Sequence, residues 1–441
     1  MLYVEHPIGT GFSYGHPYPQ NEQEASGDLD AFLQNFFTVF EDLATADFYV
    51  VGESYAGMFV PAVSRYVHRA NQKAIAQGDT KRIPIQLKGA ALGNGWIDPK
   101  IQGPATIDYS WWHGLIDQPT RDALHDEWHN CMYHGSTGTG AEQPPFHPFT
   151  VQDDCGIMWG ILQAAGNPNA YDITTWDPNV DQITFTSEAF FNDPFVKNAL
   201  HVLNPDHYWH GCQAGSGRRR RLNEVAEHQH RKLYMDNDRP LSVVPYIADL
   251  LDDGIPVVVY NGDRDMTTNM VGTELALNGM EWTGKEEWLD APRGLWKVND
   301  YPAGWAKEYK NLTFAVVYNS GHMVPYNMPN SAYDLLIRLL THKSFLDQEN
   351  PQIRVKEDGH SKKHHHHDFL STSSIDMYGV AEQRSIEAGT IPHSSSSHAN
   401  MIMPMGFALL VGVALGALLF RKRHTHREGG YRMVPDVAAQ D

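Results

Sequence analysis

The stretch that most constrains the fold is a short apolar run that ends in a turn of small residues. Residues 48–51 read Phe-Tyr-Val-Val, which is typical of a buried β-strand. The run breaks at Gly52 and passes through Ser54 into a predicted helix over residues 55–69. A strand, a sharp turn with a serine at its apex and a helix together form a nucleophile elbow, which exposes the serine Oγ. The alternative is an ordinary strand-to-helix turn that happens to carry a serine.

Charge and cysteine content limit the possible partners. The 441 residues include 34 basic and 53 acidic side chains, and the formal charge of −19 argues against nucleic acid as a partner. The cysteines are Cys131, Cys155 and Cys212, an odd number that in an extracytoplasmic protein suggests a free thiol or a missing partner. Cys131 and Cys155 could close a loop between them. No spacing of residues suggests a metal or nucleotide cofactor, so none is expected.

The C-terminal part predicts a membrane anchor. Residues 402–420 form an uncharged apolar run that is followed directly by three basic residues, 421–423. The run is long enough to cross a bilayer, and the basic flank predicts a cytosolic C-terminus. We therefore expect a single-pass type I protein whose body faces a lumen, where Asn311 would be a glycosylation acceptor. No secretory leader opens the sequence, so we expect the chain to be incomplete at its start.

Predicted strands and helices alternate on both sides of an irregular middle region. The predicted strands cover residues 2–5, 48–51, 85–92, 255–260 and 313–318, and the predicted helices cover residues 25–44, 55–69, 244–251 and 331–341. Such alternation indicates an α/β fold with a largely parallel sheet.

The middle region lacks this alternation and contains many tryptophans, scattered Gly and Pro, and all three cysteines. We interpret it as an inserted, mainly helical cap. Its basic run at residues 218–221 is either a solvated loop or a processing site. The predicted organisation is a first core part (1–101), the cap (102–239), a second core part (240–345), a disordered stalk (346–401), a transmembrane helix (402–420) and a cytosolic tail (421–441).

Three polar residues follow predicted strands in a suggestive order. Ser54, Asp265 and His322 each lie where a predicted strand ends, the position of catalytic residues in open α/β sheets. The order Ser, Asp, His is that of the α/β-hydrolases. Ser54 would attack, His322 would transfer the proton and Asp265 would orient the imidazole. Asp263 is an alternative acid, and only one of the two is expected to serve. Taken singly, each residue could be an ordinary turn or cap residue.

Several motifs resemble the serine carboxypeptidase family, with which they share their order along the chain. They are EHPIGTGFSY at 5–14, GESYAG at 52–57, GNGWIDP at 93–99, GDRD at 262–265 and GHMVPY at 321–326. The resemblance covers residues 2–342 and implies an α/β-hydrolase fold. With these motifs and the predicted anchor, the chain most resembles the membrane-bound Golgi pro-hormone-processing carboxypeptidases of fungi.

The resemblance implies roles for individual residues. It assigns the same three triad residues and makes the backbone N–H of Tyr55 an oxyanion donor. It implies that Glu53 helps to bind the C-terminal carboxylate of the substrate and that Met323 lines the pocket of the leaving residue. A carboxyl group beside a carboxylate must carry a proton to bind it, so we expect activity at acidic pH.

One family stretch, Trp-Asn-Gly-Gly-Pro-Gly-Cys, is absent from these residues and is expected upstream of Met1. In the family it supplies the second oxyanion donor, and its cysteine would pair with Cys212. The expected function is removal of C-terminal residues from peptides or proteins in the lumen of the Golgi, a vacuole or lysosome, or an endosome. Two alternatives stay open: an acyltransferase of the same fold, and an inactive truncated membrane glycoprotein.

Overall fold

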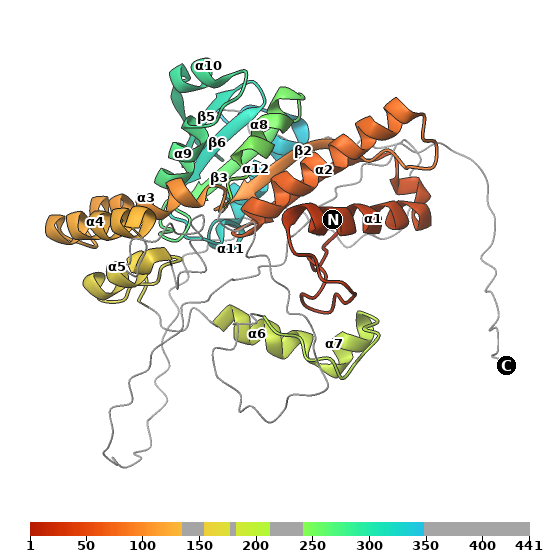
Figure 1. Cartoon of the computed structure of the whole chain (residues 1–441), viewed down its shortest axis with the longest axis horizontal. Coiled ribbons are helices and arrows are strands. Elements are labelled where there is room, and N and C mark those ends of the chain that lie inside the picture. Colours follow the sequence, from red (N-terminus) through yellow and green to blue (C-terminus); the bar gives the residue numbers. More distant parts are fainter. Residues whose placement is uncertain (135–153, 177–181, 212–240, 348–441) are drawn as a thin grey trace, which may run out of the picture. The chain divides into compact units, whose positions relative to one another are not determined.

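The computed structural model describes residues 1–134, 154–176, 182–211 and 241–347, which contain one six-stranded mixed sheet flanked by helices (Figure 1). The strands are β1 (Asp47–Glu53), β2 (Gln86–Gly93), β3 (Val257–Gly262), β4 (Arg293–Val298), β5 (Tyr301–Tyr309) and β6 (Leu312–Val317). They lie in the order β1-β2-β3-β6-β5-β4. The neighbours from β1 to β6 pair in parallel, whereas β5 and β4 continue the sheet antiparallel. The largely parallel sheet is therefore confirmed, with an antiparallel extension.

The described part of the core contains seven helices, of which the first, second, third and last lie where helices were predicted, whereas the other three were not predicted. They are α1 (Glu22–Val39), α2 (Ala56–Gln77), α8 (Val244–Asp252), α9 (Met270–Asn278), α10 (Lys285–Asp290), α11 (Val324–Asn327) and α12 (Pro329–Thr341). The first ends at Val39 rather than at residue 44, because the chain tightens there into a 3-10 turn, Glu41–Leu43. The second extends beyond residue 69 and ends where Gly78 adopts a left-handed conformation, which favours glycine.

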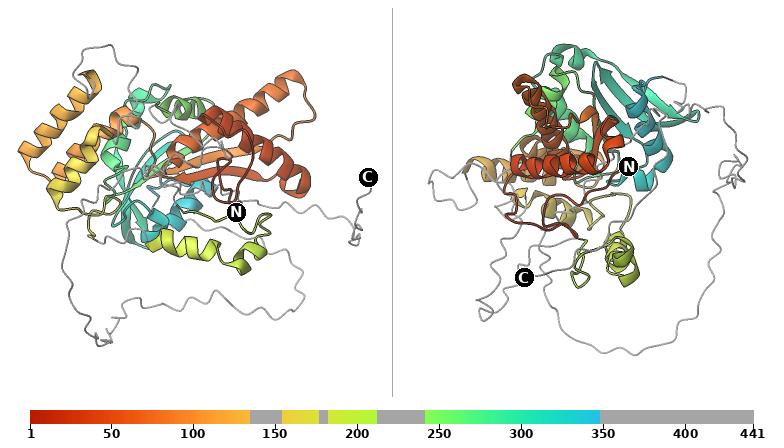
Figure 2. Two further views of the ribbon diagram at one scale, coloured as in Figure 1. Left: turned by 60° about the horizontal axis from the view of Figure 1, so that its bottom comes forward. Right: turned by 90° about the vertical axis from the view of Figure 1, so that its right-hand side faces the viewer.

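Successive residues of the parallel strands face two different helical layers (Figure 2). Phe48 and Val50 of β1 are buried in a cluster with apolar residues of α1, α2 and α8. Tyr49, between them, lies in a second cluster with Leu335 and Leu339 of α12. Because side chains alternate across a strand, a continuous apolar run is what a sheet covered on both faces requires.

One predicted strand was wrong, and one hairpin was not predicted. Residues 2–5 form no strand with any described residue. The hairpin of β4 and β5 was not predicted, because charged residues such as Arg293 and Lys307 interrupt its apolar pattern. Its turn carries Asn299 and Asp300 with φ of 52° and 66°. Two positive φ angles in succession define the tight hairpin turn that Asn and Asp favour, a signal that was present in the sequence.

The described part of the middle region is helical. Its helices are α3 (Pro99–Trp112), α4 (Gln118–His134), α5 (Ile157–Ala165), α6 (Gln182–Phe191) and α7 (Pro194–Ala199). Ile107 of α3, Leu124 of α4 and Ile161 of α5 meet in a third apolar cluster. A disulfide joins Cys131 to Cys155 beside it, with a Cα–Cα distance of 6.0 Å. Helices α3, α4 and α5 therefore form one packed unit.

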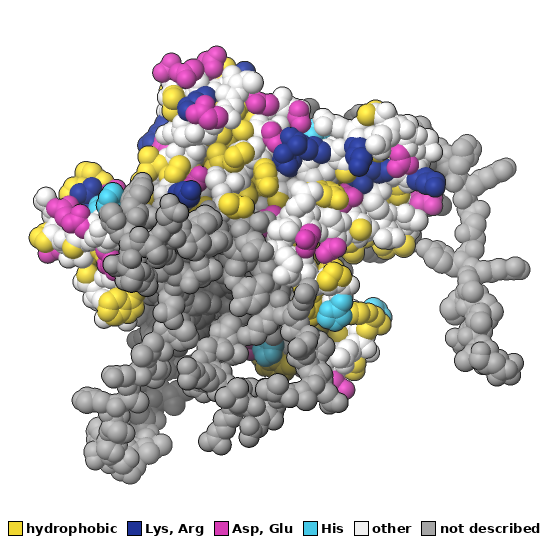
Figure 3. Space-filling model, in the orientation of Figure 1, with side chains coloured by type: hydrophobic (Ala, Val, Ile, Leu, Met, Phe, Trp, Pro, Cys, Tyr) yellow, Lys and Arg dark blue, Asp and Glu magenta, His cyan; other side chains and the backbone are white. Residues whose placement is uncertain are grey.

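Other predictions fall outside the described residues: Cys212, the basic run 218–221, most of the stalk, the membrane run 402–420 and the tail. Within the described ranges, no helix is both long and apolar enough to cross a bilayer. On the face drawn in Figure 3, Lys and Arg side chains lie among Asp and Glu side chains, so this face has mixed charge.

Candidate active site

Ser54 lies at the apex of a strained turn between β1 and α2. Its φ is 64°, a conformation that is unusual for a residue with a side chain. The backbone around it is held from both sides: Ser54 N donates to Gly93 O at 2.9 Å, and Trp96 N donates to Ser54 O at 3.0 Å. A Cβ at Gly57 would lie 2.4 Å from Trp96 N, so only glycine permits this close approach. The local geometry is that of the predicted elbow.

Asp265 and His322 meet at the ends of β3 and β6. Nδ1 of His322 lies 2.7 Å from Oδ2 of Asp265, and neither side chain is accessible to solvent beyond 1%. The same Oδ2 accepts hydrogen bonds from Nδ2 of Asn94 at 2.7 Å and from Oγ1 of Thr268 at 2.8 Å. Oδ1 accepts the backbone N–H of Thr267 at 3.0 Å. Donors on both oxygens hold the carboxylate in one orientation.

Neither Asn94 nor Thr268 was predicted from the sequence to be part of the site. Asn94 was within reach of such reasoning, because it follows β2 in a Gly-Asn-Gly turn at the same sheet edge as the triad candidates. Thr268 carried no comparable signal, since its role depends on how the loop after β3 folds back.

The structure distinguishes Asp265 from the alternative acid. Asp263 accepts the backbone N–H of Ser320 at 3.1 Å and makes no hydrogen bond to His322. Burial raises the pKa of Asp263, so its carboxyl is less readily ionised and less suited to stabilise a charged imidazole.

His322 has the properties of a proton acceptor. Burial alone would lower the pKa of His322, but the charge of Asp265, its hydrogen bond and the nearby Glu53 raise the pKa overall. Nε2 is buried and has no hydrogen-bond partner among the described residues. No hydrogen bond joins this atom to Ser54 in the described part of the chain, as is common for catalytic groups without bound substrate. Nε2 is thus free to take up a proton.

The residues expected to bind substrate flank these groups. Glu53, the last residue of β1, is only partly exposed, and burial raises the pKa of its carboxyl to about 7. Asp265 adds to this rise in pKa, whereas His322 and a backbone hydrogen bond with Val324 oppose it. Met323 directly follows His322 and is partly exposed.

Tyr55 occupies the N-cap of α2, directly after the serine. Its hydroxyl donates to Oε1 of Glu22, the first residue of α1, at 3.3 Å. Asn311, the predicted glycosylation acceptor, lies in the turn between β5 and β6 and is partly exposed.

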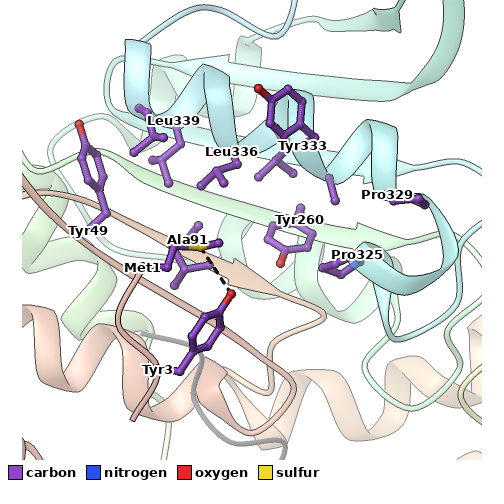
Figure 4. A pocket seen from close by; sticks show the side chains of 14 residues that line it. Met1, Tyr3, Tyr49, Ala91, Tyr260, Pro325, Pro329, Tyr333, Leu336 and Leu339 are labelled. Carbon is purple, nitrogen blue, oxygen red and sulfur yellow. Dashed lines mark hydrogen bonds between the residues drawn. The ribbon is translucent and has the colours of Figure 1, made fainter. Parts of the chain in front are cut away.

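An apolar pocket of about 290 Å³ lies on the face of the sheet that α12 covers (Figure 4). Tyr49 and Tyr260 line it from the strands, and Leu336 and Leu339 line it from α12. Its lining includes none of the triad candidates. The pocket therefore lacks the polar groups that acyl transfer requires.

A mostly parallel sheet with a serine elbow and a buried Asp–His pair at its strand ends defines an α/β-hydrolase. The crystal structure of Kex1(delta)p, a prohormone-processing carboxypeptidase from Saccharomyces cerevisiae, has this fold: it matches 77% of the chain with a TM-score of 0.59 and 23% identity, over 73% of its own length. The serine carboxypeptidase family model matches residues 1–342. The chain belongs to the serine carboxypeptidase family.

Curated relatives come from fungi, plants and animals. The chain is 26% identical to the pheromone-processing carboxypeptidase kex1 of Aspergillus terreus, over 98% of this chain and 67% of that protein. It is 34% identical to serine carboxypeptidase-like 48 of Arabidopsis thaliana, over 76% and 62%. It is 28% identical to the probable serine carboxypeptidase CPVL of Homo sapiens, over 78% and 68%. The chain therefore spans about two thirds of the length of these relatives.

Proposed function

We propose that this protein is a serine-type carboxypeptidase that releases C-terminal residues from peptides or proteins. The observation that carries the proposal is that Ser54 on its strained turn and the buried Asp265–His322 pair, joined at 2.7 Å, follow the carboxyl ends of parallel strands of one sheet. Family membership supports it. The proposal includes the peptide substrate, the acidic compartment and the roles of the individual residues that are given below.

The proposed reaction proceeds through an acyl-enzyme. Ser54 Oγ attacks the carbonyl carbon of the last peptide bond, and its proton passes to Nε2 of His322. The backbone N–H of Tyr55 donates to the oxyanion of the tetrahedral intermediate. The C–N bond then breaks as His322 protonates the leaving amine. Water attacks the ester, His322 takes its proton and returns it to Ser54, and the shortened peptide is released.

Glu53 would restrict the enzyme to chain ends. With a pKa of about 7, its carboxyl group is protonated in mildly acidic solution and can donate a hydrogen bond to the substrate's C-terminal carboxylate. Above that pH, two carboxylates would repel each other. Met323, next to the catalytic histidine, would contact the side chain of the leaving residue. This role of Glu53 favours activity in a mildly acidic compartment, at a pH where His322 still accepts a proton.

The direct test is covalent labelling by a fluorophosphonate probe, combined with release of the last amino acid from a blocked dipeptide. Wild-type protein should be labelled at Ser54 and release the residue, and Ser54→Ala should do neither. A folded wild-type protein that is not labelled would exclude serine catalysis. Labelling together with transfer of the acyl group to an added alcohol in preference to water would indicate an acyltransferase instead.

We also propose that residues 402–420 anchor the protein in a membrane of the Golgi, vacuole, lysosome or endosome, with the catalytic part in the lumen. The uncharged run and its basic C-terminal flank support this topology. In sealed microsomes, protease should digest only the tail. Endoglycosidase should shift the mobility of wild-type protein and not that of Asn311→Gln. Digestion of the catalytic part without detergent would contradict the topology.

A further inference from the structure

A short segment of the middle region contacts both loops that carry the buried catalytic pair. It comprises residues 169–175, after α5, and we call it the strap. The loops after β3 and β6 also contact each other, since Arg264 N donates to Ser320 O at 2.8 Å. The strap adds a second connection between the two loops, through hydrogen bonds to each of them.

On the aspartate side, the strap forms hydrogen bonds to residues before and after Asp265. The carbonyl of Ala170 accepts the backbone N–H groups of Met266 at 3.0 Å and of Thr267 at 3.2 Å. Ile173 N donates to the carbonyl of Arg264 at 3.0 Å. The backbone of the aspartate loop is therefore held at three points by one segment.

On the histidine side, the strap contacts both the backbone and the ring. His322 N donates to Tyr171 O at 2.7 Å, and the two rings pack with centroids 4.8 Å apart at 54°. At Gly321, a Cβ would lie 2.3 Å from Tyr171 O and 2.9 Å from Cβ of Asp172. The strap thus approaches so closely that no side chain fits beside the catalytic histidine.

The strap is itself a closed structure. Oδ1 of Asn169 accepts Tyr171 N at 2.9 Å, and the backbone N–H of Asn169 donates to Thr175 O at 2.9 Å. Ile173 is buried in the apolar cluster of α3, α4 and α5, which also contains Met266 next to the catalytic aspartate. A closed turn with a buried anchor can act as a rigid support.

We propose that the strap is a positioning element for the catalytic pair, and that Tyr171 is a positioning residue whose ring limits rotation of the His322 imidazole. The proposal rests on the proposed function of His322 as the base. Through the strap, the packing of the middle region is coupled to the geometry of proton transfer. Displacement of a catalytic group by about 1 Å can cost about a hundredfold in rate.

The main test compares Tyr171→Phe with Tyr171→Ala by the rate of fluorophosphonate labelling as a function of pH. This rate depends on His322 and does not require a peptide to bind. Tyr171→Phe keeps the ring and should label within about twofold of wild type. Tyr171→Ala should label about ten to a hundred times more slowly. The fall of the labelling rate at low pH should begin at a higher pH in Tyr171→Ala. Water then reaches the His322 imidazole and favours its charged form, which raises its pKa.

Two results would overturn the role of Tyr171. Labelling of Tyr171→Ala at the wild-type rate and pH dependence, with only the peptide KM changed, would show that the ring merely lines the substrate site. An equal loss in Tyr171→Phe and Tyr171→Ala would assign the effect to the hydroxyl.

Gly321→Ala tests the backbone contact, with Gly279→Ala as the matched control. Gly279 ends α9, and its Cβ would lie 3.4 Å from the nearest atom, Leu275 O, an ordinary contact. Gly321→Ala should slow labelling about as much as Tyr171→Ala, whereas Gly279→Ala should not. An unchanged labelling rate in a folded Gly321→Ala protein would contradict the proposal. If Gly321→Ala does not fold, the comparison of Tyr171→Ala with Tyr171→Phe decides the question.

NMR titration of the His322 imidazole separates this proposal from the proposed function. A wild-type protein that resists labelling would refute the proposed function alone. The strap still predicts that the pKa of His322 differs between wild type and Tyr171→Ala and is equal in wild type and Gly279→Ala. Equal pKa values of His322 in all three proteins would refute the positioning role of the strap.

Discussion

Asn94 and Asp265 form a hydrogen bond of 2.7 Å between Nδ2 and Oδ2, and both side chains are fully buried. Oδ1 of Asn94 accepts Gly262 N at 3.1 Å, so one amide connects the end of β2 to the end of β3 and to the carboxylate of Asp265. Asn94 has a φ of 42°, a conformation that Asn tolerates better than most residues. The carboxylate that orients His322 is therefore itself oriented by a neighbouring strand.

Asn94→Ala should lower kcat by about ten to a hundredfold with a smaller change in KM, because Asp265 loses a charge-assisted hydrogen bond and can rotate. Asn94→Asp should be worse, since two adjacent carboxylates cannot both be ionised without cost. Steady-state kinetics on a blocked dipeptide measures both. Asn35→Ala is the control, because Asn35 is exposed and its side chain bonds only within α1, to Ala31 O. Full activity of Asn94→Ala would show that the aspartate needs no such support.

Glu53→Gln should change both limbs of the pH profile. In wild type, kcat/KM should fall at high pH as Glu53 ionises around pH 7 and repels the substrate carboxylate. It should fall at low pH as His322 becomes protonated. Gln cannot ionise, so the alkaline limb should disappear. The acid limb should move to lower pH, because the charge of Glu53 raises the pKa of His322. These groups interact, so each limb reports an apparent value.

A substrate whose C-terminus is amidated provides the control for this experiment. It has no carboxylate, so Glu53→Gln should leave its alkaline dependence unchanged relative to wild type. Persistence of the alkaline limb in Glu53→Gln with a free-acid peptide would exclude Glu53 as the group responsible.

His6 should make the fold less stable in acid. It is 4% exposed, its ring packs edge-on against Phe59, and burial lowers the pKa of His6 to about 4. In the unfolded chain the group titrates near 6.5. Between these values only the unfolded state binds the proton, so the free energy of unfolding decreases as the pH falls through this window. The total loss is about 3 kcal/mol, with no further loss from this group below pH 4.

Urea unfolding of His6→Leu between pH 7 and pH 4 measures this effect. The variant should show a flatter dependence of the unfolding midpoint on pH than wild type. His210→Leu is the control, because the side chain of His210 is 47% exposed. A wild-type slope in His6→Leu would assign the acid sensitivity to other groups.

Asp334→Ala should lower the free energy of unfolding by about 3–5 kcal/mol, because it removes the carboxylate that balances the buried charge of Arg338 and leaves that charge with backbone carbonyl acceptors. Oδ1 of Asp334 accepts Nε of Arg338 at 2.6 Å and Nε1 of Trp296 at 2.8 Å. The two charged side chains are 6% and 0% exposed. The double variant Asp334→Leu with Arg338→Met should recover part of the loss, since apolar groups can replace a buried ion pair.

Chemical denaturation measures these differences. Lys285→Ala is the control, because the ion pair of Lys285 with Glu281 involves a largely exposed carboxylate and should contribute less than about 1 kcal/mol. A loss of similar size in Asp334→Ala and Lys285→Ala would show that burial does not determine the cost.

Local sequence was sufficient where structure depends on neighbours in the chain. The run before Ser54 had to form a strand, because its β-branched and aromatic residues are apolar on both faces. The small residues after it had to form a tight turn. The hairpin of β4 and β5 was missed because charged residues such as Arg293 and Lys307 interrupt the apolar pattern from which strands are recognised.

The sequence by itself determined the class of fold, the elbow at Ser54 and the presence of polar residues where three strands end, because strand, turn and helix propensities act over a few residues. Only the tertiary structure decided that Asp265 rather than Asp263 faces His322. It also decided that Asn94, 171 residues away, holds that aspartate, and that Tyr171 of the middle region packs on the histidine. Such contacts depend on how distant segments pack at one sheet edge, where a shift of one residue reverses the direction of a side chain.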